Sequence, residues 1–237
     1  MKPERLDKIL SGTGLYSRTQ ARSLILIGAV SVDGVPLRRP EARVPRSAAI
    51  VAAGEEIDTA EFVYYIMNKP AGYVSASRDE GPLAAVTSLL PEHLRRRGLQ
   101  CVGRLDADVT GLLLLTDDGA YAHRVTAPRS GVKKTYELWL DGPAGAEDVE
   151  VLARGVVLAD GTVCRPAELR FAEGEPFHVF VTVTEGKYHE VKRLLASRGR
   201  RVLNMRRVSI GGLRLPEDLS FGEFHQLTWE EAEQAFI

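Results

Sequence analysis

The sequence has few of the features that mark disulfide-rich, zinc-binding or membrane proteins. It contains only two cysteines, Cys101 and Cys164, far apart and without CxxC spacing, which predicts buried thiols rather than a disulfide framework or a zinc site. No apolar run approaches the ~20 residues of a membrane helix, and the charged first residues lack the apolar stretch of a signal peptide. We therefore expect a cytoplasmic protein with no membrane partner.

The charged residues are unevenly distributed, although the net charge is only -1. Residues 1–47 contain nine Lys or Arg against four acids, a balance of +5, so the remaining 190 residues carry -6. A small basic module joined to a mildly acidic body suggests that the module attracts a polyanion such as RNA. A solvated charged face gives the same composition, so composition alone leaves both interpretations open.

The first fifty residues show the pattern of two helices followed by a hairpin. Apolar residues recur at helical spacing over 6–10, and Ser17-Arg-Thr-Gln20 is a capping box that starts a second helix ending at Gly28. Arg18 and Arg22, four residues apart, lie on one side of this helix and could face successive phosphates. Two short strands around a turn are indicated by Val30–Val32, Asp33-Gly34 and Val35–Leu37.

In the rest of the chain, short β-prone runs alternate with loops, and helical patterns are fewer. The main helical patterns are 83–90 and 190–198. This balance favours an α+β fold, with a largely antiparallel or mixed sheet in the larger domain. We expect a small domain over residues 1–60 and a larger one over 61–237. The β-prone runs are 62–67, 102–105, 112–116, 135–140, 177–184 and 202–210.

The stretch Gly103–Gly119, GRLDADVTGLLLLTDDG, carries four acids around a run of leucines. Asp117 and Asp118 are expected to be turn residues, because Asp-Gly pairs adopt positive φ readily. Asp106 and Asp108 lie in one short loop. A glycosidase needs its two carboxylates on opposite sides of a sugar, so this pair does not predict one.

Asp106 is the candidate for chemistry in this loop. If the chain is extended here, Arg104 and Asp106 share a face while Leu105 points into the core. The guanidinium then keeps the carboxylate ionised, and an ionised, positioned aspartate is a candidate nucleophile or base. A structural Arg-Asp pair gives the same pattern, so the residue types alone leave both interpretations open.

A second unusual stretch, Glu185–Arg193, follows a β-prone run and opens a helix. It contains three cations, Lys187, Lys192 and Arg193. The adjacent pair His189-Glu190 lacks the i, i+4 spacing of metal ligands, so we expect no metal. The chain also has no Gly-rich phosphate loop and no Gly-x-Ser-x-Gly elbow.

The first module resembles the S4 RNA-binding domain. The resemblance implies RNA binding through the positive face of the second helix and the hairpin, and we assign Arg5, Lys8, Arg18 and Arg22 to it. The matching residues are Arg5-Leu-Asp-Lys8, Ser17-Arg18, Ala21, Gly28 and Val30-Ser-Val-Asp-Gly34.

The larger domain resembles the pseudouridine synthases, which isomerise uridine in RNA without a cofactor. Together with the S4-like module, it resembles the ribosomal branch, and flanking motifs such as Thr116–Gly119 and Ala122–Arg129 are most similar to enzymes of the A type, acting on small-subunit (16S) rRNA. The matching motifs are Asn68–Val74, Gly103–Gly119, Lys134-Thr-Tyr136 and Glu185–Arg193.

The resemblance implies a role for each matched residue. Asp106 is the catalytic aspartate that breaks the uracil-ribose bond, Tyr136 stacks under the uracil and is a candidate for assisting proton removal, and Lys192 pairs with the carboxylate. Arg104 fills the space left by the flipped nucleotide. We assign further RNA contacts to Lys69, Lys187 and Arg193.

One position departs from the family pattern. The residue three after the aspartate usually carries a hydroxyl, and here it is Val109, so we expect Thr110 to substitute. The overall expectation is a monomeric, cofactor-free and metal-free isomerase whose partner is 16S rRNA, free or partly assembled. The alternatives are a sister enzyme for 23S rRNA and a catalytically inactive ribosome assembly factor.

Overall fold

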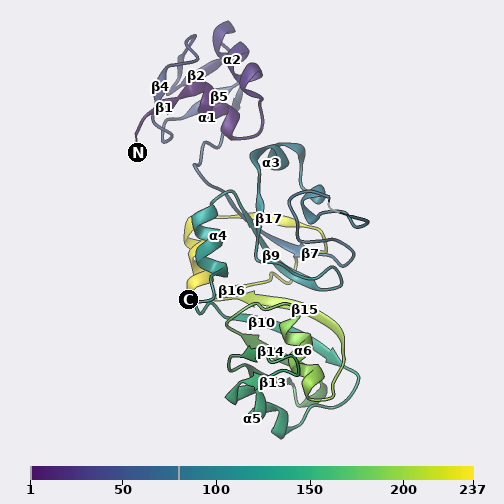
Figure 1. Ribbon diagram of the computed structural model, residues 1–237. Helices are drawn as coiled ribbons and strands as arrows, with labels where there is room; N and C mark the ends of the chain where they lie inside the picture. The colour runs from purple at the N-terminus through teal and green to yellow at the C-terminus, as the bar shows by residue number, and fades with distance from the viewer. Residues whose placement is uncertain (1, 80) are drawn as a thin grey trace. The chain divides into compact units, whose positions relative to one another are not determined.

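The computed structural model describes residues 2–79 and 81–237, which divide into two compact units (Figure 1). The first unit runs to Val63 and also includes Thr87–Leu99, and the second consists of Tyr64–Val86 and Gln100–Ile237. No helix in the described ranges is long and apolar enough to cross a membrane.

The first unit is a small α+β domain. Its helices are α1 (Leu6–Gly12), α2 (Arg18–Ile27) and α3 (Glu92–Arg97). The expected capping box starts α2: Ser17 Oγ accepts from Gln20 N at 3.2 Å, and Gln20 Oε1 accepts from Ser17 N at 2.8 Å. Two small sheets, β3-β2-β5-β6 and β1-β4, complete it, with strands β1 (Glu4–Arg5), β2 (Val30–Val32), β3 (Val35–Pro36), β4 (Arg43–Val44), β5 (Ile50–Ala52) and β6 (Glu55–Glu56).

The second unit is built on a nine-stranded mixed sheet, as the sequence predicted. The strand order is β13-β14-β10-β15-β9-β7-β17, with β8 beside β9 and β16 beside β15. All pairs are antiparallel except β15 with β9. The strands are β7 (Tyr64–Lys69), β8 (Gln100–Val102), β9 (Thr110–Thr116), β10 (Lys134–Leu140), β13 (Glu168–Ala172), β14 (Glu175–Val183), β15 (Val202–Ile210), β16 (Leu213–Arg214) and β17 (Phe224–Leu227).

Helices bury the sheet of the second unit in two clusters. In one, α5 (Ala146–Arg154) and α6 (Glu190–Ser197) pack on the β10-β14-β13 part of the sheet. In the other, α4 (Gly119–Thr126) and α7 (Trp229–Glu233) pack on β7 and β9. The remaining elements are the β11 (Val156–Val157) and β12 (Val163–Cys164) pair and the short helices η1 (Val86–Leu89) and η2 (Gln234–Phe236).

Gly111 permits the parallel pairing of β9 with β15. Its φ is +102°, and a Cβ atom there would lie 2.3 Å from the carbonyl oxygen of Arg207. Only glycine fits such a close backbone approach at positive φ without strain. This contact brings the loop that precedes β9 against β15.

Two local predictions are wrong. The helix expected over 83–90 is only the single 3-10 turn η1, because the preceding Ala85 is drawn into a β-bridge with Val74. The Asp117-Asp118-Gly119 segment is not a positive-φ turn: Asp118 is the N-cap of α4, and its Oδ1 accepts from the backbone of Ala120 and Tyr121, both at 2.9 Å.

Candidate active site

Asp106 sits in a tight loop before β9 that side chains from the preceding segments hold in place. The carbonyl of Asp106 accepts from Val109 N at 3.1 Å, and the carbonyl of Ala107 accepts from Gly72 N at 2.8 Å. Ser75 Oγ accepts from Leu105 N at 3.0 Å and donates to Leu105 O at 2.9 Å. The loop backbone is therefore fixed on both sides of the aspartate.

Lys69 anchors this loop from within and is not available to RNA, which corrects its assignment as an RNA contact. The side chain is completely buried, and its ammonium donates to the carbonyls of Asp106 (3.2 Å), Ala107 (3.4 Å) and Val109 (2.9 Å), and to its neighbour Pro70. Burial lowers the pKa of Lys69 to about 8, against the attraction of the loop carboxylates. A buried cation is stable here because the carbonyl oxygens replace its water.

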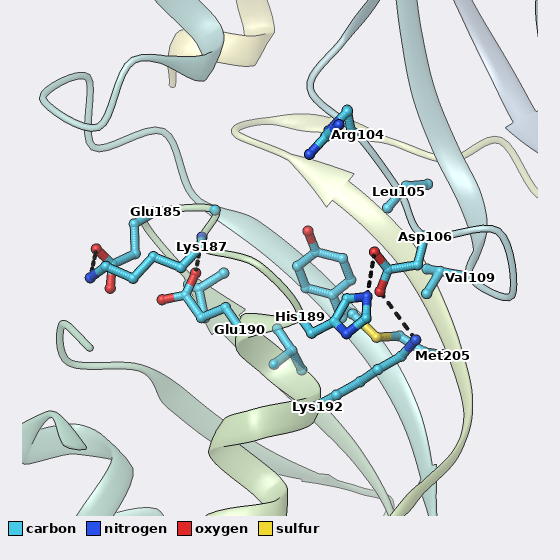
Figure 2. A pocket seen from close by; sticks show the side chains of 14 residues that line it. Arg104, Leu105, Asp106, Val109, Glu185, Lys187, His189, Glu190, Lys192 and Met205 are labelled. Carbon is cyan, nitrogen blue, oxygen red and sulfur yellow. Dashed lines mark hydrogen bonds and ion pairs between the residues drawn. The ribbon is translucent and has the colours of Figure 1, made fainter. Parts of the chain in front are cut away.

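The Asp106 carboxylate meets the side chains of Lys192 and His189 from the Glu185–Arg193 stretch (Figure 2). Its Oδ2 lies 3.1 Å from Lys192 Nζ, and its Oδ1 lies 3.4 Å from His189 Nε2. The same ammonium contacts both oxygens of Asp108, at 2.7 and 2.9 Å. Burial lowers the pKa of Lys192, but the hydrogen bonds to Asp108 and Asp106 outweigh it and hold the pKa above its usual value.

The partner expected for Asp106 from the extended chain, Arg104, is not its partner. Arg104 is exposed, and in Figure 2 its side chain lies away from the carboxylate. Leu105 is buried, as predicted. Asp106 and Asp108 share one ammonium, so they lie on the same side of the site, and this geometry also excludes a pair of carboxylates across a sugar.

A cavity of about 70 Å³ opens beside Asp106. Tyr136 from β10, Val183 from β14 and Met205 from β15 form apolar parts of its wall. The Asp106 side chain is 33% exposed, so a group that enters this cavity can reach its carboxylate.

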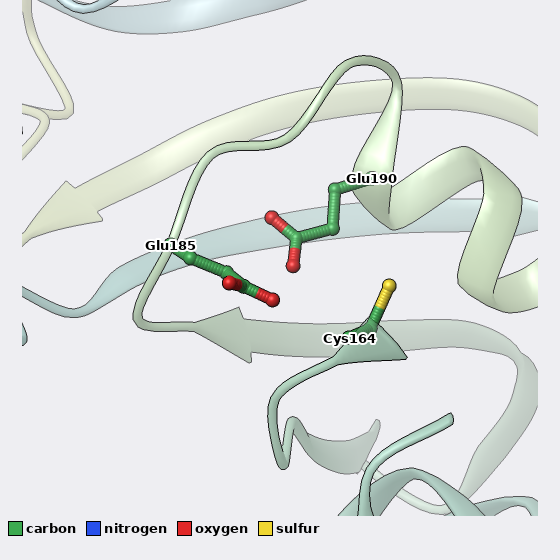
Figure 3. Close-up of side chains that lie close together, drawn as sticks. All are labelled: Cys164, Glu185 and Glu190. Carbon is green, nitrogen blue, oxygen red and sulfur yellow. The ribbon is translucent and has the colours of Figure 1, made fainter. Parts of the chain in front are cut away.

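Two buried carboxyl groups, Glu185 and Glu190, also line this cavity (Figure 2) and lie close to Cys164 (Figure 3). Glu185 follows β14, Glu190 begins α6, and their carboxylate oxygens and Cys164 Sγ lie within 4.8 Å of one another. Burial, reinforced by Glu185, raises the pKa of Glu190 to about 7. Hydrogen bonds from Glu190, Lys187 and Arg165 N overcome burial and lower the pKa of Glu185 to about 2.

This arrangement is a carboxyl pair that shares one proton at neutral or mildly acidic pH. Glu185 Oε2 accepts from Lys187 Nζ at 2.7 Å and Oε1 from Arg165 N at 2.8 Å, while Glu190 Oε2 accepts from Lys187 N at 3.1 Å. The cluster has the donor atoms of a metal site, but its carboxylates are satisfied by these protein donors. These hydrogen bonds are enough to explain the conformation of the loop between β14 and α6 without a bound ion.

The other assigned RNA contacts fall into two groups. In the second unit, Lys187 is held by Glu185 and Arg193 by Asp160, with both side chains partly exposed. In the first unit, the fully buried carboxylate of Asp7 gathers three arginines, Arg5, Arg18 and Arg22, at 2.8, 3.8 and 3.3 Å, and Lys8 pairs with Glu4. The hydrogen bond from Arg5 in particular lowers the pKa of Asp7.

The three arginines around Asp7 leave an excess of positive charge on one face of the first unit. Because a single carboxylate faces three guanidinium groups, it orients them without neutralising them. Planar cations positioned in this way can contact phosphates along a nucleic-acid backbone.

Sequence reasoning missed two residues of the site. His189 was considered only as a metal ligand, and Ser75 carried no motif, so neither signalled its contact with the Asp106 loop. The Thr110 hydroxyl does not close that loop in place of the missing one: it donates to Met205 O at 3.4 Å in β15. Val109 is buried in the core instead, and its carbonyl is bound by Lys69.

Comparisons with known proteins identify the family of the chain. The S4 domain family matches residues 4–50, and the RNA pseudouridylate synthase family matches residues 63–197, more than half of the chain. The protein therefore belongs to the RNA pseudouridine synthases that carry an S4 RNA-binding domain, and it is an isomerase that converts uridine to pseudouridine in RNA.

Individual relatives match nearly the whole chain. Ribosomal small subunit pseudouridine synthase A of Escherichia coli is 37% identical over 229 residues, covering 96% of this chain and 97% of that protein. The uncharacterised RNA pseudouridine synthase YtzG of Bacillus subtilis is 38% identical over 230 residues, or 96% of each chain. A crystal structure of a pseudouridylate synthase superposes with a TM-score of 0.69 at 32% identity and covers 98% of this chain and 99% of that one.

Proposed function

We propose that the protein isomerises one uridine in small-subunit (16S) rRNA, with Asp106 as the catalytic carboxylate. The observation that carries the proposal is an S4 domain joined to the Asp106 site in a chain that aligns end to end with small-subunit enzymes, including those of Escherichia coli and Vibrio cholerae. The RNA is then the ligand of both units, through phosphates at Arg5, Arg18 and Arg22 and through a single flipped uridine at Asp106.

The reaction moves one bond and one proton. The N1–C1′ bond of the uridine breaks, the uracil turns, and a C5–C1′ bond forms; C5 then loses its proton to a base and N1 gains one, so the composition is unchanged. Attack on the ribose, attack on the base and assisted elimination all begin from an ionised carboxylate beside the flipped nucleotide. Asp106 is the candidate because its carboxylate lines the cavity and lies 3.1 Å from the Lys192 ammonium.

The surrounding side chains take the remaining roles. Tyr136 is buried in β10 and offers an aromatic wall on which the uracil stacks, and it is the candidate for assisting proton removal at C5. Arg104 is exposed at the edge of the cavity, where its planar cation can occupy the place of the flipped nucleotide.

Release of tritium from uracil C5 tests the proposal, since C5 loses its hydrogen in the reaction. We expect release from labelled 16S rRNA and none from 23S rRNA, and a loss of more than about 1000-fold in Asp106→Asn. Asp108→Asn is the matched control: it removes a carboxylate from the same ammonium, but one that is 74% exposed, and we expect a loss below about 10-fold.

Each other outcome has a distinct meaning. Release from 23S rRNA only would assign the protein to the large subunit. Equal losses in the two variants would mean that Asp106 acts only as part of a charge cluster. No release from free RNA or from partly assembled subunits would contradict the assignment to ribosomal RNA.

A further inference from the structure

Tyr188 is the most exposed aromatic side chain in the part of the chain that the structure describes. It is 72% exposed, and its ring stacks on the imidazole of His189, with centroids 3.8 Å apart and planes 20° from parallel. A ring so exposed gains little from burial, so the hydrophobic effect does not explain its position. One face of the tyrosine is covered by His189, and most of the ring faces solvent.

This stacked pair is directly connected to the catalytic carboxylate. His189 Nε2 lies 3.4 Å from Asp106 Oδ1, and His189 lines the cavity opposite Glu185 (Figure 2). The backbone of His189 is left-handed, with φ 49° and ψ 32°, at the residue that precedes α6. A residue other than glycine adopts this conformation at a cost, which is typical of loops that hold a side chain for function.

A cation lies next to the pair. The carbonyl of Tyr188 accepts from Arg193 Nη1 at 3.4 Å, whereas the ammonium of Lys187, the preceding residue, donates to Glu185 and to Val163 O. An exposed aromatic face beside positive charges is the combination by which proteins bind unpaired nucleotides: the ring stacks on a base, and the cations face the phosphates.

We propose that the outer face of Tyr188 is a binding site for an unpaired base next to the target uridine. The target lies at Asp106, His189 lies against Asp106, and Tyr188 continues the stack outward, so a base on Tyr188 belongs to a neighbouring nucleotide of the same strand. His189 is then a positioning residue that joins this second base site to the catalytic carboxylate. The inference rests on the proposed function, because it takes the nucleotide at Asp106 as the target.

Stacking on an aromatic ring predicts a specific pattern among variants. Tyr188→Ala should lower kcat/KM for the RNA by between about 5-fold and about 150-fold, through a higher KM with a nearly unchanged kcat. Tyr188→Phe keeps the ring and should restore at least half of the wild-type kcat/KM. Phe221→Ala is the matched control, since it removes another exposed aromatic ring of the second unit, 62% exposed, and should leave KM unchanged.

A binding readout separates this inference from the proposed function. Full-length Asp106→Asn protein is irradiated with 16S rRNA and, separately, with 23S rRNA, and the crosslinked peptides are identified by mass spectrometry. We expect a nucleotide attached to the loop at Tyr188 with at least one of the two RNAs, lost in Asp106→Asn/Tyr188→Ala and kept in Asp106→Asn/Tyr188→Phe.

The two ideas fail in different ways. Crosslinks confined to other segments, with an unchanged KM in Tyr188→Ala, would overturn the base site even if tritium is released from 16S rRNA. A crosslink at Tyr188 without tritium release would keep the base site and overturn the proposed reaction on ribosomal RNA. A loss of kcat/KM that is equal in Tyr188→Ala and Tyr188→Phe would also overturn the stacking argument, because the ring itself would then not matter.

Discussion

Replacing Glu190 with glutamine should make the second unit more stable at pH 8 and remove most of its dependence on pH between 5 and 7. Glu190 and Glu185 lie together in the interior, 5% and 7% exposed (Figure 3). Glutamine has nearly the same shape as a protonated glutamic acid. It can still donate to Glu185 and accept from Lys187 N, as Glu190 does in the folded protein.

The direction in which stability changes with pH depends on which state of the protein, folded or unfolded, holds the Glu190 proton. The pKa of Glu190 is raised from 4.5 to about 7, so between these pH values the folded protein keeps a proton that the unfolded chain releases. The unfolding free energy therefore falls as the pH rises through this window. At about 1.4 kcal/mol for each unit of pKa, the loss is about 3 kcal/mol by pH 7.

Glu185 works in the opposite direction and at lower pH. Its pKa is lowered from 4.5 to about 2, so it adds about 3 kcal/mol of stability as the pH rises from 2 to 4.5 and loses this contribution on acidification. The pair therefore stabilises the fold most near pH 4.5 to 5. Above pH 7 both groups are ionised and their contributions nearly cancel.

Tryptophan fluorescence during denaturation provides the assay, because Trp139 and Trp229, the two tryptophans of the chain, both lie in the second unit. We expect wild type and Glu190→Gln to unfold alike at pH 5 and to differ at pH 8 by about 3 kcal/mol, or roughly 6–12 °C in Tm. Glu175→Gln, at an exposed position, is the control for loss of a charge. Parallel pH curves for wild type and Glu190→Gln would refute the shared proton.

Three further substitutions test the scaffold of the site. Gly111→Ala should lower the free energy of unfolding by more than about 3 kcal/mol, since its Cβ would lie 2.3 Å from Arg207 O. Gly119→Ala is the control: it has open space around it and should cost less than about 0.5 kcal/mol. Both losses are measured by denaturant titration. Lys69→Met should lower the free energy of unfolding by at least about 2 kcal/mol, because it leaves the loop carbonyls unpaired. It should also reduce tritium release by the protein that remains folded. Full activity would show that the ammonium does not hold the loop. Asp118→Ala should lower the free energy of unfolding by about 2 kcal/mol, measured by denaturant titration, and leave kcat unchanged. Asp118→Asn should recover most of this stability. A reduced kcat in Asp118→Ala would show that this helix cap takes part in the reaction.

The short-range features of the fold were predictable because residues a few positions apart produce them. The capping box of Ser17 and Gln20 closes over three residues, and the apolar pattern from Thr110 to Thr116 needs only its own neighbours to form a buried strand. The same local logic failed at Asp118, where an Asp-Gly pair suggested a turn. The competing signal was equally local, because an aspartate before Gly119 can also cap a helix.

The family resemblance implied the pairing of Lys192 with Asp106, which the structure shows, but the residue types alone did not. From an extended chain, the pair expected was Arg104 with Asp106. The partner is Lys192, 86 residues away, because the carboxylate faces α6 rather than the neighbouring arginine. Lys69 shows the same limit: it was assigned as an RNA contact, and only its burial under the loop showed that it binds backbone carbonyls.

The sequence by itself determined the family and the mixed α+β fold, and it singled out Asp106 and Lys192 as candidates for the chemistry, because motifs and periodicity are written in consecutive residues. Tertiary structure alone decided that His189 reaches Asp106, that Glu185 and Glu190 share a proton, and that Thr87–Leu99 joins the first unit. These features depend on burial and on groups that converge from different elements. The pKa of Glu190 is therefore a property of its surroundings in the folded chain and not of the residue type.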